Sequence, residues 1–61
     1  MAEVYSTEVL DRVLEGARIC EAHWQAEGDA ELLADAQART QRILAGTAYE
    51  ADILGALDWL D

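Results

Sequence analysis

Apolar side chains recur every three or four residues in three segments of the chain, and this spacing is typical of amphipathic helices. The first segment has its apolar positions at Val9, Leu10, Val13, Leu14, Ala17, Cys20 and Trp24. The second has them at Leu32, Leu33, Ala36, Thr40, Ile43 and Leu44. The third has them at Tyr49, Ile53, Ala56, Leu57 and Leu60. The pattern predicts three helices that bury one face each against a shared core.

Two glycine-containing pairs separate these segments. In Gly28-Asp29 and in Gly46-Thr47, a residue that commonly ends helices stands directly before one that commonly caps their starts. Thr47 also stands three residues before Glu50, which is the spacing of a capping box. We therefore expect Thr47 to be the N-cap of the last helix, with Glu50 reaching back to it.

These signals predict an all-α fold in a single domain, with helices at about residues 7–27, 30–45 and 48–60. Short connections make successive helices antiparallel. We expect a three-helix bundle, or a long hairpin whose third helix packs across it or onto a second copy. Gly16 and Gly55 lie inside helical segments, and either a close helix crossing or a tolerated weakness explains them.

The size and charge of the chain limit its stability. Its 61 residues carry 13 acids against 4 arginines, for a net charge of −9. A chain this short buries little core, and its like charges repel one another. Cys20 is the only cysteine and His23 the only histidine, so we expect neither a disulfide nor a structural zinc site within one chain. A homodimer or a bound partner is the expected source of additional stability.

The composition also argues against several kinds of chemistry. An acidic chain lacks the basic footprint that direct binding of nucleic acid requires. Cys20 and His23 stand three residues apart, as a catalytic pair on one helix would, but Cys20 belongs to the apolar face, where cysteine acts as a small hydrophobic residue. The acidic stretch 27–31 lacks the ligand spacing of a calcium loop. We expect no catalytic activity, no cofactor and no metal site.

The sequence also predicts where the protein resides. No segment approaches the ~20 consecutive apolar residues of a membrane span. Residues 1–5 lack the basic start and apolar run of a signal peptide. Together with the single cysteine, these features predict a cytoplasmic protein that does not bind a membrane.

The acidic charge is unevenly distributed along the chain. Residues 1–28 contain six acids and two arginines, a net charge of −4. Residues 29–46 contain three acids and two arginines, a net charge of −1. Residues 47–61 contain four acids and no base, again −4. The first and third helices therefore carry nearly all of the unbalanced charge.

Three carboxylates of the first segment recur at helical spacing. Glu8, Asp11 and Glu15 stand three and four positions apart, which places them about 5–6 Å apart along one helix face. This separation is comparable to the charge spacing along a nucleic-acid backbone, so the face suits a basic groove of a nucleic-acid-binding protein. The alternative interpretation is a solvated face that serves only solubility.

Two large apolar residues fall outside the predicted core faces. Ile19 projects from the back of the first helix, beyond the acidic cluster, and Trp59 falls off the core face of the third helix, beside Asp52. Exposed aromatic and aliphatic side chains amid charge are typical of interface anchors. Asp52, Asp58 and Asp61 extend the acidic contact in this prediction.

In its size, its acidity and its lack of motifs, the whole chain resembles the small acidic inhibitor proteins that phages make, anti-CRISPR proteins and nucleic-acid mimics among them. The resemblance is one of type and assigns no role to any residue. It implies that the chain obstructs a nucleic-acid-binding complex or regulator of a host cell.

The leading hypothesis is a non-enzymatic helical interaction protein that binds a basic surface of a larger protein and regulates or inhibits it. Charge would steer such an association, and salt would weaken it. One alternative is a self-assembling structural subunit whose acidity serves solubility or adaptation to salt. Another is an accessory subunit or antitoxin-like chain that folds together with its cognate protein.

Overall fold

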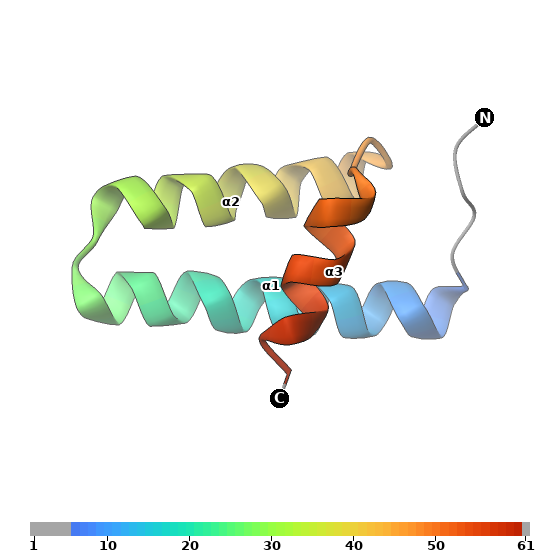
Figure 1. Ribbon diagram of the computed structural model, residues 1–61, viewed down its shortest axis with the longest axis horizontal. Helices are drawn as coiled ribbons and strands as arrows, with labels where there is room; N and C mark the ends of the chain where they lie inside the picture. The colour runs from blue at the N-terminus through green and yellow to red at the C-terminus, as the bar shows by residue number, and fades with distance from the viewer. Residues whose placement is uncertain (1–5, 61) are drawn as a thin grey trace.

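Three helices make up the computed structural model, which describes residues 6–60. Helix α1 spans Thr7–Glu27, α2 spans Ala30–Ala45 and α3 spans Glu50–Asp58. Helices α1 and α2 form an antiparallel hairpin, and α3 lies across it in front of α1 (Figure 1). The predicted all-α fold is confirmed, and α3 packs across the hairpin of its own chain.

The sequence signals at the α1–α2 connection act as predicted. The Asp29 side chain accepts a hydrogen bond from the backbone N–H of Leu32 at 3.0 Å, so Asp29 caps α2. Gly28 and Gly46 end α1 and α2 in the left-handed region, with φ values of 75° and 76°, which glycine adopts without steric cost. The bounds of α1 and α2 agree with those predicted.

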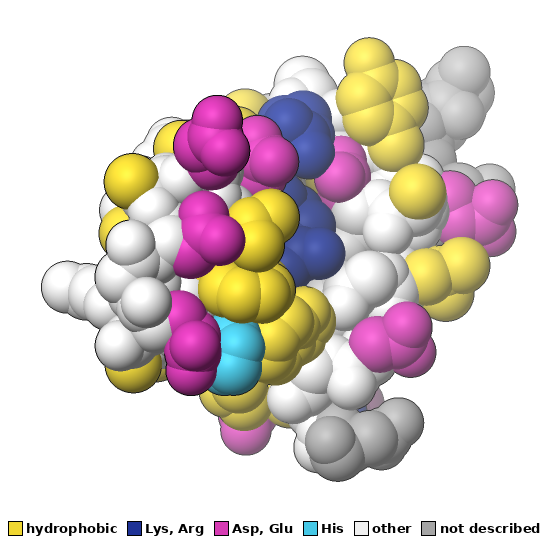
Figure 2. Space-filling model, turned by 60° about the vertical axis from the view of Figure 1, so that its left-hand side comes forward, with side chains coloured by type: hydrophobic (Ala, Val, Ile, Leu, Met, Phe, Trp, Pro, Cys, Tyr) yellow, Lys and Arg dark blue, Asp and Glu magenta, His cyan; other side chains and the backbone are white. Residues whose placement is uncertain are grey.

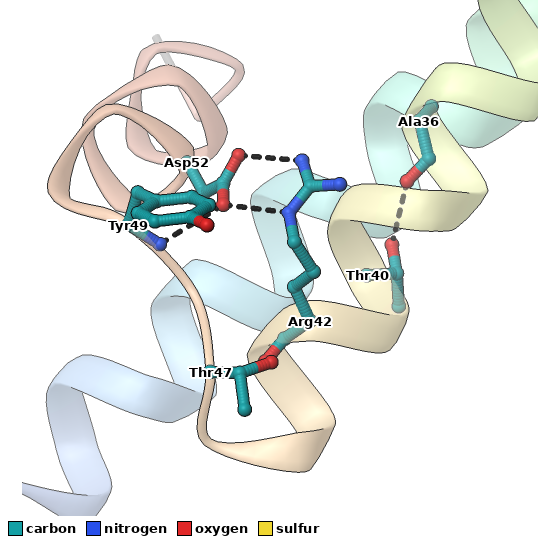
Figure 3. Close-up of polar contacts among 6 residues, drawn as sticks. All are labelled: Ala36, Thr40, Arg42, Thr47, Tyr49 and Asp52. Atoms are coloured by element: carbon teal, nitrogen blue, oxygen red, sulfur yellow. Dashed lines mark hydrogen bonds and ion pairs between the residues drawn. The ribbon is translucent and has the colours of Figure 1, made fainter.

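The predicted start of the third helix is wrong by two residues. The N-cap is Tyr49, and its backbone N–H donates to the Asp52 carboxylate at 3.0 Å. The Thr47 hydroxyl instead donates to the backbone carbonyl of Arg42, at the end of α2 (Figure 3). The reciprocal contact expected between Thr47 and Glu50 is thus replaced by one in which Asp52 reaches back to Tyr49.

Small and β-branched residues form the core where the three helices meet. Its buried members are Val13 and Ala17 of α1, Ile43 of α2, and Ile53 and Ala56 of α3. All of them belong to the predicted apolar faces.

The predicted apolar faces extend beyond this core, and three of their residues are exposed. Leu44 near the end of α2 and Tyr49 before α3 lie largely in solvent, and Leu32 near the start of α2 is partly exposed. Helix α3 begins beside the C-terminal end of α2 and crosses the middle of α1, so it does not reach the start of α2, where Leu32 lies (Figure 1).

A glycine permits the close crossing of α1 and α3. A Cβ atom built on Gly16 would lie 1.9 Å from the backbone oxygen of Ala56, a distance at which α3 would have to move away. Gly16 is buried at this crossing, so the absence of a side chain determines how closely the two helices approach. Of the two explanations for Gly16, the close crossing is the one the geometry supports.

One buried polar residue joins α1 to α2. The Thr40 hydroxyl lies within hydrogen-bonding reach of the Glu21 carboxylate on α1 and 3.1 Å from the carbonyl oxygen of Ala36 in its own helix. A buried hydroxyl needs such partners to offset its loss of water. Thr40 is therefore compatible with the predicted apolar face of α2.

Candidate partner-binding surface

The three predicted carboxylates of the first helix lie together on the surface. Glu8, Asp11 and Glu15 are all exposed, on the side of α1 opposite buried Val13 and Ala17. The same stripe continues toward the end of the helix with exposed apolar residues. We define the outer face of α1 as Glu8, Asp11, Glu15, Ile19, Ala22 and Ala26, all of which are exposed.

No ion pair neutralises the carboxylates on this face. Within residues 6–60, the one ion pair joins Arg42 to Asp52, on the other two helices. Arg12 and Arg18 flank the outer face of α1 and are themselves exposed. The stripe therefore presents three hydrated carboxylates, with two hydrated guanidinium groups at its edges.

The apolar end of this face has one large side chain. Ile19 is 40% exposed, one helical turn beyond Glu15. Ala22 and Ala26 continue the stripe with small side chains, which would let a partner approach the helix closely. The structure thus brings together the acidic cluster and one of the two predicted anchors.

Asp52 is held within the molecule. Its carboxylate accepts hydrogen bonds from the Nε of Arg42 at 2.8 Å and the Nη2 of Arg42 at 2.7 Å, besides the one from the Tyr49 backbone (Figure 3). These bonds, above all those from Arg42, lower the pKa of Asp52 from 3.8 to about 2. The same contact raises the pKa of Arg42. A carboxylate with its oxygens so occupied is a poor candidate for contact with a partner.

Trp59 packs against the end of α1. Its ring centroid lies 5.1 Å from that of His23 and 6.2 Å from that of Trp24, and Trp59 is half-buried. The sequence pattern placed Trp59 off the core face of the third helix. Because α3 lies across the hairpin, that side of α3 contacts α1. Figure 2 shows the chain's single histidine between hydrophobic side chains and an acidic one, with the arginines beyond the hydrophobic side chains.

The large apolar side chain that α3 exposes is Leu54. It is 57% exposed and stands four residues from both Glu50 and Asp58, which are also exposed. We call Glu50, Leu54 and Asp58 the outer face of α3. Sequence reasoning missed Leu54, although its place four residues after an acid and four before another was a usable signal. Asp61, the remaining predicted contact, lies outside the described residues.

Cys20 is buried and forms no disulfide. No three His, Cys, Asp or Glu side chains within residues 6–60 are arranged to hold a metal ion. Over the same residues, no helix combines the length and apolar character needed to cross a bilayer.

Comparisons with protein-family models, with curated proteins and with solved structures find no match to this chain. The surface geometry, the charge and the packing therefore carry the functional argument.

Proposed function

We propose that the protein is a non-enzymatic interaction protein that binds a basic surface of a larger protein through the outer face of α1. The observation that carries this proposal is the stripe of three exposed carboxylates that ends in exposed Ile19. A groove that binds nucleic acid is such a basic surface, so the bound chain would compete with nucleic acid and inhibit its partner.

Electrostatics supports a basic partner over an acidic or neutral one. The outer face of α1 belongs to a molecule with a net charge of −9, which speeds encounter with a positive surface and repels negative ones. Its carboxylates have no ion-pair partner within residues 6–60, so a lysine or arginine of a partner would not have to displace an existing contact.

Exposed apolar groups beside the carboxylates support specific docking over loose attraction. Ile19 and Leu54 are the large aliphatic side chains on the two outer faces, and both are substantially exposed. Burying them against a partner would add hydrophobic free energy that is insensitive to charge screening. We therefore assign Glu8, Asp11, Glu15 and Ile19 as the primary contact, with Leu54 as a second anchor.

A second candidate function, self-assembly, is favoured by a different observation. Leu44 is 57% exposed and Tyr49 is 71% exposed, and both flank the connection between α2 and α3. A homodimer joined at this end would cover them. If so, sizing of the protein should give a dimer, and L44Q with Y49S should convert it to a monomer of unchanged helical content.

The primary proposal is tested by capture from a lysate of the organism that carries this sequence, or of its host. The immobilised wild-type chain should retain a basic, nucleic-acid-handling protein that elutes as salt is raised, because screening weakens the contact. A triple variant E8Q/D11N/E15Q should lose this protein. Since each substitution keeps the side-chain shape, the loss would report the missing charge.

A charge-matched control separates the outer face from net charge alone. The variant E27Q/E31Q/D35N removes three exposed carboxylates that lie on neither outer face and should still capture the partner. Equal loss in both triple variants would show that only total charge matters. Capture unaffected by either variant, and resistant to salt, would refute the proposed role of the acidic face.

A further inference from the structure

A groove lined by side chains from all three helices lies apart from the outer face of α1. Its volume is about 360 Å³, within the range of small-molecule sites in proteins. Its wall combines two indoles with charged groups of both signs. The lining residues that matter for recognition are Trp24, Asp35, Arg39, Arg42, Asp52 and Trp59.

Two of the four charged groups in this groove neutralise each other. Arg42 and Asp52 form the bidentate ion pair described above, whereas neither Arg39 nor Asp35 belongs to an ion pair within residues 6–60. These two stand one helical turn apart on α2, so their Cβ atoms lie about 5–6 Å from each other. No ion pair joins them.

Arg39 has a hydrogen-bond donor that lacks a partner among the described residues. Its Nε is buried and has no hydrogen-bond partner within residues 6–60. Its Nη1 occupies space beside Gly55, 2.9 Å from where a Cβ atom of that residue would lie. Arg39 also lines the groove, and the Nη groups of a guanidinium bind a carboxylate through charge-assisted hydrogen bonds.

We propose that this groove binds a free aromatic α-amino acid. The α-carboxylate would accept hydrogen bonds from Arg39, the α-ammonium would donate to Asp35, and the side chain would lie on Trp24 and Trp59. A single carbon joins the carboxylate to the ammonium, which suits two opposite charges one helical turn apart. A simple carboxylate would leave Asp35 to repel it, and a simple amine would leave Arg39 without an acceptor.

The test titrates the full chain with L-phenylalanine while intrinsic tryptophan fluorescence is measured. The chain has two tryptophans, and both line the groove, so the emission reports on this site. We expect a saturable change. L-phenylalaninamide lacks the carboxylate and 3-phenylpropionate lacks the ammonium, and each should bind about tenfold more weakly, the value of one hydrogen bond to a charged group.

Variants then assign each charge to its partner. R39Q should weaken binding of L-phenylalanine about tenfold without weakening binding of L-phenylalaninamide. D35N should weaken binding of L-phenylalanine about tenfold but strengthen binding of 3-phenylpropionate, because the repulsion between the two carboxylates is removed. R18Q, which removes an exposed arginine of α1, is the control and should bind as wild type does.

Three results would overturn the proposal. One is the absence of a saturable change with L-phenylalanine, and another is equal affinity for all three probes. The third is unchanged L-phenylalanine affinity in R39Q and D35N variants that fold as shown by circular dichroism. The comparison of probes needs no variant, so the proposal stays testable if a substitution prevents folding. None of these results bears on the outer face of α1.

Discussion

At the scale of single residues, the two glycines inside helices have different roles. Gly16 lies under the backbone oxygen of Ala56, where no side chain fits, whereas a Cβ atom on Gly55 would meet only the end of the Arg39 side chain. A backbone atom moves only with its helix, but the end of an arginine swings aside at little cost. Local sequence cannot distinguish the two glycines, because the difference depends on which atoms of another helix lie opposite each of them.

We predict that G16A destabilises the protein by about 1–3 kcal/mol, the usual cost of overpacking. G55A should be neutral or stabilising, since alanine is favoured over glycine in a helix by about 1 kcal/mol. Urea unfolding of both variants measures the difference. Equal effects of the two substitutions would contradict the close crossing at Gly16.

Asp52 shows the same limit of sequence reasoning at another position. Its spacing allowed a role in partner contact, but its two oxygens are occupied by Arg42 and by the backbone N–H of Tyr49. Arg42 lies ten residues earlier, at the end of another helix, so the pairing depends on how α3 folds back. The N-cap of α3 is Tyr49 and not Thr47, whose hydroxyl donates to the carbonyl of Arg42.

Because its pKa is about 2 in the folded protein against 3.8 ordinarily, the charged Asp52 stabilises the fold above about pH 4. This stabilisation is lost as the pH falls through about 2. D52N should therefore lower the free energy of unfolding at neutral pH by about 1 kcal/mol, as expected for an ion pair with a partly exposed arginine. It should have little effect near pH 2.

Thermal unfolding of wild type and D52N across this pH range measures the effect. D58N removes an exposed carboxylate and is the control, with no comparable loss between pH 4 and pH 2. A D52N deficit that persists unchanged at pH 2 would show that the Asp52 charge is not its cause.

At the scale of helices, the sequence predicted α1 and α2 to the residue and α3 less well. Gly28 and Gly46 are strong local stop signals, and Asp29 is a strong start signal. Helix α3 is short and ends in a looser turn at Trp59 and Leu60, where contacts with α1 decide the geometry. Those contacts also half-bury Trp59 and leave Leu54 exposed.

Because Trp59 is half-buried and Leu54 is exposed, Leu54 replaces Trp59 as the proposed anchor on α3. We predict that L54Q leaves the melting temperature nearly unchanged, because a surface substitution rarely exceeds 0.5 kcal/mol, yet weakens capture of the basic partner. W59L should instead lower the melting temperature. Capture unaffected by L54Q would remove the outer face of α3 from the binding surface.

At the scale of the whole molecule, net charge and size shape the stability. A net charge of −9 on 61 residues favours expansion of the chain, and one intramolecular ion pair within residues 6–60 does little to offset it. The charge distribution along the chain was readable from the sequence. Which carboxylates remain unpaired was not, since pairing depends on helix packing.

We therefore expect the melting temperature to rise as the pH is lowered from 7 to 5, because partial protonation relieves the repulsion. It should fall again below about pH 4, where the Asp52 carboxylate of the unfolded chain takes up a proton while that of the folded protein stays charged. Differential scanning calorimetry at a series of pH values follows both limbs. A steady fall from pH 7 to 5 would indicate that paired acids dominate instead.

The central claim is that the outer face of α1 contacts a basic partner. The most direct measurement is an amide NMR titration of the isotopically labelled chain with the captured protein. The account predicts that the first perturbed signals are those of Glu8, Asp11, Glu15 and Ile19, and that added salt reverses the changes. Perturbations centred on Arg39 and the two tryptophans, with the outer face of α1 unaffected, would contradict it.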